Sequence, residues 1–452
     1  MSDNFTRVMV GTAEVDVTPP IGTQLAGYGY ERISEGVILP LKARILVMNE
    51  GEKRCVLINC DFLAVTVEET NNIRKLIHNL TGIAPERVMI CCTHSHTGPE
   101  MRGVEDWCVW EPNEEYLDQM NVKVAEAVAV AAQNQTPAII CMGKQHEEGL
   151  AFNRRFRMKN AEEQFGPDKM HPTAVDIDEN NTDCAGVAGP IDPEFGVVLF
   201  KRELTSKPFA MIVNYSLHVD VTSGNKISSD FPGIMAETLK KIYGEELVTL
   251  YIQGACGNIN HCAYLQNNPY PGTGEWKSEQ IGRAFAGKAM NIAEKALPSK
   301  TNVIEIATEI LDVPRYPKDD IIVRKMLKDI SSKKEEELTF FETSFMKLYN
   351  SYSDERTDKR EIMTLRIGDA VFCSAPGELF VEWGLEIKKW SPFEYTFIAE
   401  LCNDYVGYIP TFEAFYRGGY EASPIISVKA TSALGMMIAD ANFRNLHKLA
   451  EL

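Results

Sequence analysis

The sequence has a deficit of positive charge, no paired-cysteine motif and no long apolar run. Its 452 residues include 46 Lys and Arg against 64 Asp and Glu, which gives a formal charge of −18. This acidic excess argues against general binding to nucleic acid or to an anionic membrane surface, because both need a positive protein face. No apolar stretch reaches the roughly 20 residues that a membrane-spanning helix needs.

The eleven cysteines are scattered, without any CxxC spacing, and several lie inside apolar runs such as Val56–Cys60 and Val88–Cys92. This pattern is typical of buried free thiols rather than of a zinc knuckle or a disulfide framework. The first residues also lack the basic segment followed by an apolar segment that marks a secretory signal. We therefore expect a cytoplasmic protein with no integral membrane association.

Strand and helix patterns alternate along the chain, which predicts a layered α/β protein with helices packed over β-sheet. Thr66 and Glu69 form a capping box that starts one helix, and Asn113 starts another. Further helices are expected at 231–242, 275–296 and 434–449. Strands are expected at 8–11, 43–48, 54–60, 88–92, 138–142, 197–201, 209–214, 247–252, 304–311, 362–366, 370–374 and 396–400, with 43–48 and 54–60 paired across a turn.

Two strands and two segments stand out from this alternation. The strands at 88–92 and 247–252 are almost continuously apolar, which is typical of central strands covered on both faces. Residues 155–195 are loop-like and contain the polar run Asp176–Asp183. Residues 315–360 are highly charged with helical periodicity, which indicates a helical insertion between strands. Since no linker divides the chain, we expect one domain over residues 1–452.

Histidines mark the candidate site. Of the eight in the chain, His94 and His96 lie where the buried strand 88–92 runs into a Gly-Pro turn. A third, His218, ends another apolar strand, Met211–His218. Chain that leaves the end of a sheet is where α/β enzymes place functional groups. Imidazoles from two strand ends together with a carboxylate are a plausible zinc site, although the HxH pattern alone is weak evidence.

Other motifs follow in a fixed order between about residues 9 and 425. They are Gly11–Pro20, Gly27–Gly29, Thr93–Pro99, Asn153–Arg154, Asn214–His218, Pro376–Glu378, Asn403–Tyr408 and Tyr420–Glu421. Together they resemble the catalytic domain of the neutral/alkaline, non-lysosomal ceramidases. The resemblance implies an α/β fold of layered mixed β-sheets flanked by helices, without the C-terminal immunoglobulin-like domain. It also implies zinc-dependent hydrolysis of the amide bond of an N-acyl small molecule by metal-activated water.

The resemblance further implies one Zn²⁺ per chain, with ligands His94, His218, Glu378 and Tyr408. Tyr405 competes with Tyr408 for the last position, and the spacing from Tyr408 to Tyr420 favours Tyr408. His96, Arg154 and Tyr420 are the implied catalytic residues, which donate hydrogen bonds to the oxyanion and pass a proton to the leaving amine. Arg155 and Arg157 lie close enough in the sequence to be confused with Arg154.

Several alternatives stay open at this point. Asp230 either caps the helix that follows it or hydrogen-bonds to an imidazole ligand and orients it. Cys256 is a rival nucleophile, but no histidine partner can be assigned to it. The segment Gly257–His261 lacks the serine-containing element of the ceramidases. The chain could therefore be a non-catalytic binding protein that keeps the fold, or a zinc hydrolase of an ester or a sugar-derived substrate.

Overall fold

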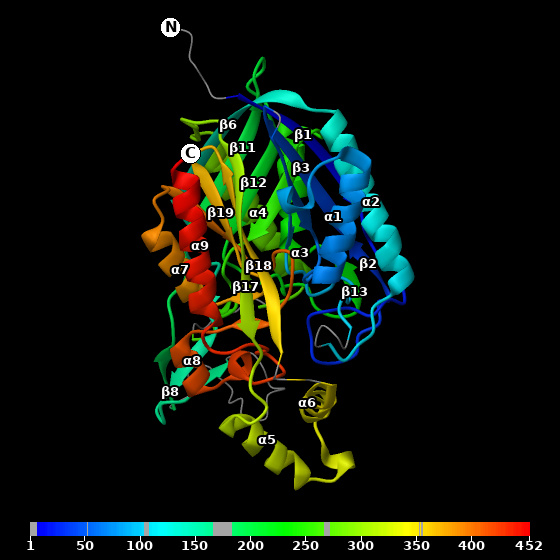
Figure 1. Ribbon diagram of the computed structural model, residues 1–452, viewed down its shortest axis with the longest axis vertical. Coiled ribbons are helices and arrows are strands. Elements are labelled where there is room, and N and C mark those ends of the chain that lie inside the picture. Colours follow the sequence, from blue (N-terminus) through cyan, green and yellow to red (C-terminus); the bar gives the residue numbers. More distant parts are fainter. Residues whose placement is uncertain are drawn as a thin grey trace.

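Two β-sheets stacked face to face, with helices on their outer faces, form the centre of the protein (Figure 1). The computed structural model describes residues 7–51, 53–103, 108–165, 183–265, 272–351, 353 and 356–452. This architecture is the layered α/β arrangement that the alternating strand and helix patterns predict. Among the described residues, no helix combines the length and the apolar character needed to cross a bilayer.

The larger sheet has nine strands. Their order is β14 (Val248–Gln253), β12 (Pro208–Tyr215), β11 (Glu194–Arg202), β6 (Thr136–His146), β1 (Arg7–Asp16), β3 (Lys42–Glu50), β4 (Lys53–Cys60) and β5 (Val88–Cys92), with β16 (Leu297–Pro298) paired to β6. The predicted hairpin is confirmed, because β3 and β4 pair antiparallel with Val47 opposite Val56. The pairs β4–β5 and β12–β14 are parallel.

The prediction that 88–92 and 247–252 are central strands is wrong. They form β5 and β14, the two end strands of the larger sheet. Their apolar side chains are nevertheless buried, because the second sheet covers them: Met89 and Leu250 belong to one core cluster with Phe372. A continuous apolar run indicates that a strand is buried on both faces, not that it is central in its sheet. Here the second sheet buries one face of these end strands.

The second sheet has four strands, in the order β17 (Ile304–Pro314), β18 (Thr357–Ile367), β19 (Ala370–Ser374) and β21 (Tyr395–Ala399). Helices α7 (Val381–Trp390) and α9 (Leu434–Ala450) pack on its outer face through a cluster that includes Ile387 and Ile438. Helices therefore enclose the pair of sheets from both sides, and the interior between the sheets is apolar.

Four helices cover the outer face of the larger sheet. They are α1 (Val67–Thr81), α2 (Glu114–Gln133), α3 (Asp230–Tyr243) and α4 (Glu275–Ala293). The predicted cap at Thr66 is confirmed, since its hydroxyl accepts a bond of 3.1 Å from the Glu69 amide. The carboxylate of Glu69 does not complete the capping box; it accepts a bond from Asn121 of α2 instead, because the two helices pack together.

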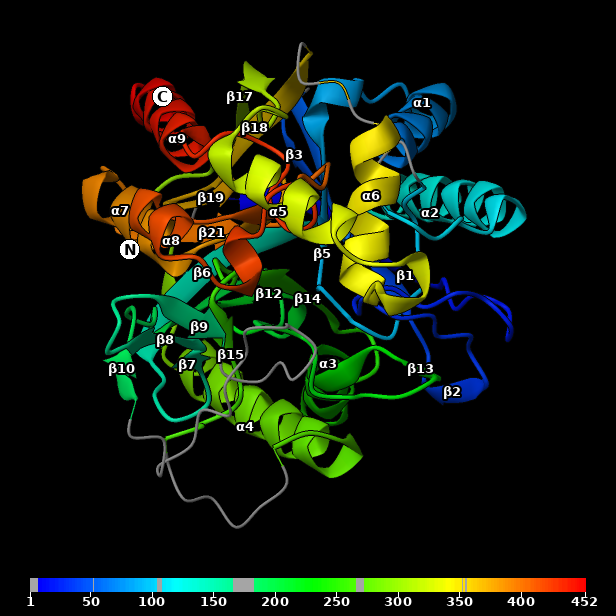
Figure 2. The same ribbon diagram turned by 90° about the horizontal axis from the view of Figure 1, so that it is seen from below.

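The charged segment between β17 and β18 forms α5 (Ile321–Ser331), η3 (Glu335–Glu337) and α6 (Phe340–Ser351). These helices lie at the lower end of the molecule in Figure 1 and across that end in Figure 2. Val323 and Phe345 pack there against Phe415 of α8 (Phe412–Arg417) and against Val428. The insertion therefore covers the end of the sheets that carries the candidate site.

Residues 155–195 are less loop-like than their composition suggests. The structure contains β8 (Arg155–Met158), β9 (Glu163–Phe165) and β10 (Cys184–Val187), which pair as a small sheet, while 176–182 of the polar run lie outside the described residues. The remaining short elements are β2 (Gly36–Leu39), η1 (Pro85–Arg87), β7 (Phe152–Asn153), β13 (Lys226–Ser228), β15 (Ile259–Asn260), β20 (Glu378–Leu379), β22 (Tyr408–Ile409) and η4 (Tyr420–Ala422).

Candidate metal centre

Three histidines from two strand ends converge at the lower end of the larger sheet. His94 lies two residues after β5, and His218 lies three residues after β12. Their Nε2 atoms are 3.0 Å apart, and Nε2 of His96 is 3.2 Å from Nε2 of His94. All three side chains are buried. The structure therefore brings together the histidines that the strand-end argument singles out.

Backbone carbonyls fix the orientation of two of these rings. Nδ1 of His94 lies 3.1 Å from the Leu63 carbonyl oxygen, and Nδ1 of His218 lies 3.1 Å from the Cys256 carbonyl oxygen. Because a carbonyl oxygen can only accept, each Nδ1 carries the proton and each Nε2 presents a lone pair. Two lone pairs facing each other at 3.0 Å repel unless a cation lies between them.

The carboxylate of Glu378 completes a donor set around this point. Its Oε2 lies 3.4 Å from Nε2 of His94 and 3.6 Å from Nε2 of His218, and it has no hydrogen-bond partner although it is buried. The Tyr405 hydroxyl donates a hydrogen bond to the other oxygen, Oε1, which favours the ionised form of the carboxylate. A carboxylate of this kind stays ionised and available to a metal.

Two imidazoles and a carboxylate fit a zinc ion by chemistry and by spacing. Zinc prefers nitrogen and oxygen donors in a tetrahedral arrangement, with Zn–N bonds of about 2.0–2.1 Å. Such bonds place two ligand nitrogens about 3.3 Å apart, close to the 3.0 Å between His94 and His218. The sharing of Nδ1 protons with backbone carbonyls is also the usual way in which metal-binding histidines are oriented.

The backbone at His94 is held in an unusual conformation. Its φ angle is +73°, which is uncommon for a residue other than glycine. The amide of His94 donates a 2.9 Å bond to the Phe62 carbonyl, which helps to hold this conformation. Strain of this type costs about 1–3 kcal/mol and is concentrated at functional sites. It turns the His94 ring out of the strand direction and toward His218.

His96 lies in the same cluster but is packed on its other side by Tyr28, with ring centroids 5.1 Å apart. Burial and the neighbouring His94 lower the pKa of His96 to about 3, so its ring is neutral. Its Nδ1 is buried without a hydrogen-bond partner. His96 is therefore placed either to ligate alongside His94 or to exchange a proton with a substrate group.

The two candidate tyrosines contact different partners. The hydroxyl of Tyr405 donates a 2.6 Å bond to Oε1 of Glu378, whereas the hydroxyl of Tyr408 accepts a 3.0 Å bond from Arg154. Tyr408 is the strand partner of Glu378 in the parallel pair β20–β22. Tyr408, which the resemblance assigns as a ligand, is thus the strand neighbour of Glu378. Tyr405, the competing residue, hydrogen-bonds directly to the Glu378 carboxylate.

Arg154 is separated from its neighbours in the sequence by its contacts. Its guanidinium bonds to Tyr408, to the Gly257 carbonyl and to Glu421. Arg155 instead pairs with Glu163 and with the other oxygen of Glu421. Arg157 donates to a backbone carbonyl at an exposed position. Of the three arginines, Arg154 is the one joined to a tyrosine of the site.

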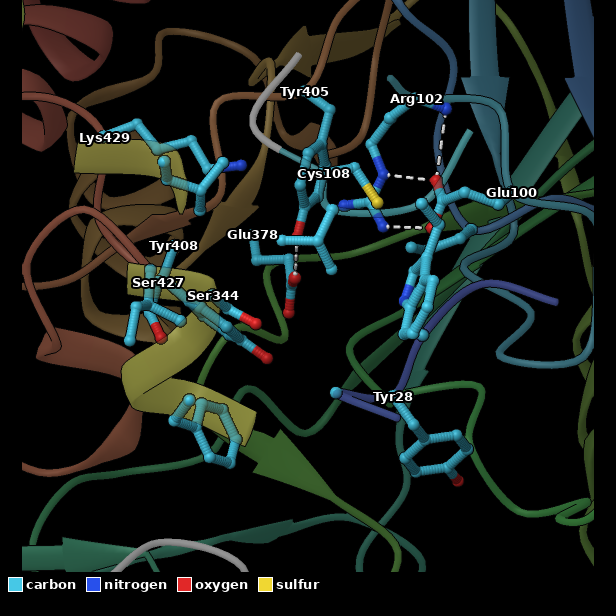
Figure 3. Close-up of a pocket in the computed structure, with 18 of the residues that line it drawn as sticks. Tyr28, Glu100, Arg102, Cys108, Ser344, Glu378, Tyr405, Tyr408, Ser427 and Lys429 are labelled. Carbon is cyan, nitrogen blue, oxygen red and sulfur yellow. Dashed lines mark hydrogen bonds and ion pairs between the residues drawn. The ribbon is translucent and has the colours of Figure 1, made fainter. Parts of the chain in front are cut away.

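A cavity of about 120 Å³ opens beside the donor set (Figure 3). Tyr28, Glu100 and Arg102 lie along one wall, and Ser344, Ser427 and Tyr408 lie along the opposite wall. Glu100 and Arg102 form an ion pair with a 2.7 Å contact. Tyr420, the third predicted catalytic residue, also lines the cavity, and its ring lies 5.6 Å from that of Tyr408.

Asp230 and Cys256 support the site from outside it. The carboxylate of Asp230 accepts bonds from the amides of Thr222 and Phe231 and from the Ser278 hydroxyl, so it ties the start of α3 to the chain that follows His218. Burial and the adjacent Glu400 carboxyl raise the pKa of the Cys256 thiol well above its usual range. Cys256 thus contributes its carbonyl to His218 rather than a thiolate nucleophile.

One pair near the site has no counterpart in the sequence argument. Nδ1 of His261 lies 3.1 Å from Oδ1 of Asp220. Burial alone would lower the pKa of His261, but the Asp220 carboxylate raises it to about 10, so the ring is charged. His261 is the last residue of the segment Gly257–His261, which lacks the serine of the ceramidase motif. This departure from the motif is the sequence signal that could have drawn attention to His261.

Comparisons with known proteins bear on the fold. No family model matches the sequence, and no curated protein matches it significantly. The neutral ceramidase from Pseudomonas aeruginosa has a TM-score of 0.74 and 18% identity, over 99% of this chain and 75% of that one. A second solved structure, of a ceramidase complexed with C2, has a TM-score of 0.75 and 16% identity, over 99% of this chain and 76% of that one. The chain therefore has the fold of neutral ceramidase.

Proposed function

We propose that this chain is a zinc-dependent hydrolase that cleaves the amide bond of an N-acyl compound. The observation that carries the proposal is the pair of Nε2 lone pairs of His94 and His218, which face each other at 3.0 Å with a buried carboxylate oxygen of Glu378 beside them. The fold shared with neutral ceramidase supports the same activity.

His94, His218 and Glu378 would hold the ion, with Tyr408 as the fourth ligand. A zinc ion supplies a Lewis acid for the carbonyl and lowers the pKa of a coordinated water to near 7. The Leu63 and Cys256 carbonyls keep the two Nε2 atoms aimed at the metal position, and Tyr405 keeps Glu378 in place. These contacts preorganise the site, so little rearrangement is needed during the reaction.

Arg154, Tyr420 and His96 would act on the substrate. Arg154 holds the Tyr408 hydroxyl at the edge of the cavity, and the Tyr420 ring packs beside it. Together they would donate hydrogen bonds to the oxyanion that develops on the amide carbonyl. His96, on the Tyr28 side of the cavity, would accept a proton from the attacking water and pass it to the departing nitrogen, because an amine leaves far more readily than an amide anion.

Metal analysis tests the first half of this proposal. Protein purified without added zinc is expected to contain close to one zinc per chain, and His94→Ala and His218→Ala are expected to lose it. His447→Ala is the matched control, because His447 is exposed on α9. Wild-type protein that holds no tightly bound metal, or variants that retain it, would contradict the proposal.

A substrate screen tests the second half. The panel contains N-acyl amines, N-acyl amino acids, N-acetyl sugars and matched esters. We expect amide hydrolysis that a chelator abolishes and that added zinc restores. Hydrolysis confined to esters or sugar-derived compounds would contradict the amide assignment and favour the alternative of a zinc hydrolase that acts on those substrates.

The alternative hypothesis, a non-catalytic binding protein that keeps the fold, is based on the Gly257–His261 segment. The charged His261–Asp220 pair occupies the place of the serine-containing element, which is a change in the surroundings of the site rather than in its donor set. A protein that binds members of the panel tightly but turns none of them over would favour this reading. We also propose the cytoplasm as the compartment, since all eleven cysteines are free thiols.

A further inference from the structure

A second cavity, of about 340 Å³, adjoins the cavity of the metal centre. It lies between the inserted helices α5 and α6 on one side and the segment 415–427 on the other. The two cavities share four lining residues: Phe341, Tyr420, Ile426 and Ser427. At this boundary the Phe341 and Tyr420 rings meet edge to face with centroids 6.2 Å apart. We call this second space the side chamber.

The inner part of the side chamber is mainly apolar, and its charged lining residues, Lys325, Asp329 and Glu342, belong to the two inserted helices. Met326, Ile330 and Phe415 line it, and the buried Ile330 and Phe415 also belong to the apolar cluster beneath the insertion. Lys325 and Asp329 are exposed on α5 and mark its outer end. Such a mainly apolar lining is suited to hydrocarbon; the Ser427 hydroxyl, which is buried without a hydrogen-bond partner, lies at the boundary with the metal cavity.

We propose that the side chamber holds the hydrocarbon chain of a substrate that carries a single chain, with the amide carbonyl at the metal centre. This inference rests on the proposed amide hydrolysis and specifies its substrate class. The volume of the chamber, about 340 Å³, lies at the lower end of the roughly 300–1,000 Å³ of pockets that enclose drug-sized ligands, so it takes one hydrocarbon chain of limited length. The preferred acyl group is therefore of medium length.

The two walls of the metal cavity decide which part of the substrate enters the side chamber. His96 packs on Tyr28, so the leaving amine belongs on the wall that also carries the Glu100–Arg102 ion pair. Tyr420 contacts Phe341 at the boundary, so the acyl group belongs on the opposite side. The acyl chain thus points into the chamber, and a polar amine stays beside Glu100 and Arg102.

The metal cavity is too small to enclose a second long chain, which would have to extend into solvent. At about 120 Å³ it is smaller than the roughly 300–1,000 Å³ of pockets that enclose a drug-sized ligand. An amine component of the size of glycine fits this volume, whereas a long-chain amine does not. Ceramide carries a long chain on both sides of its amide bond, so it is expected to be a poor substrate.

A series of N-acylglycines tests the inference, with acetyl, hexanoyl, decanoyl and hexadecanoyl groups and released glycine as the readout. We expect kcat/KM to rise about two- to fourfold for each methylene until the chamber is full. It should level off or fall between decanoyl and hexadecanoyl, and an N-acylsphingosine should be at least tenfold poorer than N-decanoylglycine. No dependence on length, or a rise that continues through hexadecanoyl, would overturn the inference.

Two tryptophan substitutions on α5 localise the effect. Met326→Trp fills the side chamber and should lower the ratio of decanoyl to acetyl kcat/KM at least tenfold. Ile321→Trp is the matched control, because Ile321 is 75% exposed and does not line the chamber. This control should keep the wild-type ratio. Equal ratios in the two variants would show that the chain binds elsewhere.

Binding of free fatty acid separates this inference from the proposed function. Calorimetry should detect decanoate binding to the wild-type chain and at least tenfold weaker binding to Met326→Trp. If no compound is hydrolysed but this difference is found, the hydrolase proposal fails and the chamber assignment stands. If N-acylglycines are hydrolysed but decanoate does not bind, the hydrolase proposal stands and the chamber assignment fails.

Discussion

Gly27 lies against the imidazole of His96 so closely that a Cβ on Gly27 would be 2.6 Å from Cγ of the ring. Gly27 also has a φ angle of +102°, which other residues rarely adopt. Both properties make glycine a requirement at this position. The contact ties the N-terminal Gly27–Gly29 motif to the His94–His96 motif, about seventy residues later in the chain.

Gly27→Ala is therefore expected to displace His96 and to lower kcat/KM at least tenfold. Gly22→Ala is the matched control, because Gly22 has a φ angle of +96° but nothing within 4 Å of its Cβ position. Both variants should lose about 1–2 kcal/mol of unfolding free energy from the backbone alone, measured by urea denaturation. Equal loss of activity in both would show that the close contact with His96 has no role in catalysis.

Zinc should stabilise the folded chain. Since a bound cation would compensate the facing lone pairs of His94 and His218, the proposed metal should bind the folded state selectively. Saturation at a thousandfold excess over Kd adds about 4 kcal/mol. Thermal unfolding should show a higher Tm with zinc than with a chelator. Calcium, which prefers oxygen ligands, should produce no such shift, and His218→Ala should respond to neither ion.

Substitution of the two tyrosines separates their roles. Tyr405→Phe removes the 2.6 Å bond that holds Glu378, and loss of such an outer contact usually weakens metal binding about 10–100-fold. Tyr408→Phe removes the proposed fourth ligand, whose hydroxyl Arg154 holds at the cavity, and should both weaken zinc binding and lower kcat at least tenfold. Zinc affinity by chelator competition and steady-state kinetics measure the two effects. Weaker zinc binding in Tyr408→Phe than in Tyr405→Phe would identify Tyr408 as a direct ligand.

Acid should destabilise the protein partly through Glu194. Burial alone would raise the pKa of this residue, but Lys388 and Lys144 lower it. Because the pKa is lower in the folded state, the stabilisation is present above the unfolded pKa of about 4.5 and is lost as pH falls through the folded value. Glu194→Gln should therefore lose about 1 kcal/mol at pH 7 and less at pH 4.

Urea unfolding at a series of pH values measures this difference. Glu245→Gln serves as the control, since Glu245 is exposed. A loss in Glu194→Gln that is the same at pH 4 and pH 7 would mean that the ion pairs do not account for the stabilisation.

The sequence alone determined the elements and the order of the motifs. Periodicity and capping depend on residues a few positions apart, so the β3–β4 hairpin, the helix that starts after Thr66 and the strand end before His94 could be read from local patterns. The candidate donors His94, His218 and Glu378 followed from motifs and their resemblance to a known family. The structure then placed these three side chains together.

Only the tertiary structure decided how these donors are held and what lies beside them. The carbonyls of Leu63 and Cys256 that set the two histidine tautomers belong to the backbone, and so the residue types in the sequence do not predict these contacts. The pairing of β20 with β22 makes Tyr408 the strand neighbour of Glu378, whereas Tyr405 is the residue that hydrogen-bonds to the Glu378 carboxylate. Local patterns are set by neighbours in the chain, whereas tautomers, ion pairs and cavities are set by atoms that meet only when distant segments pack.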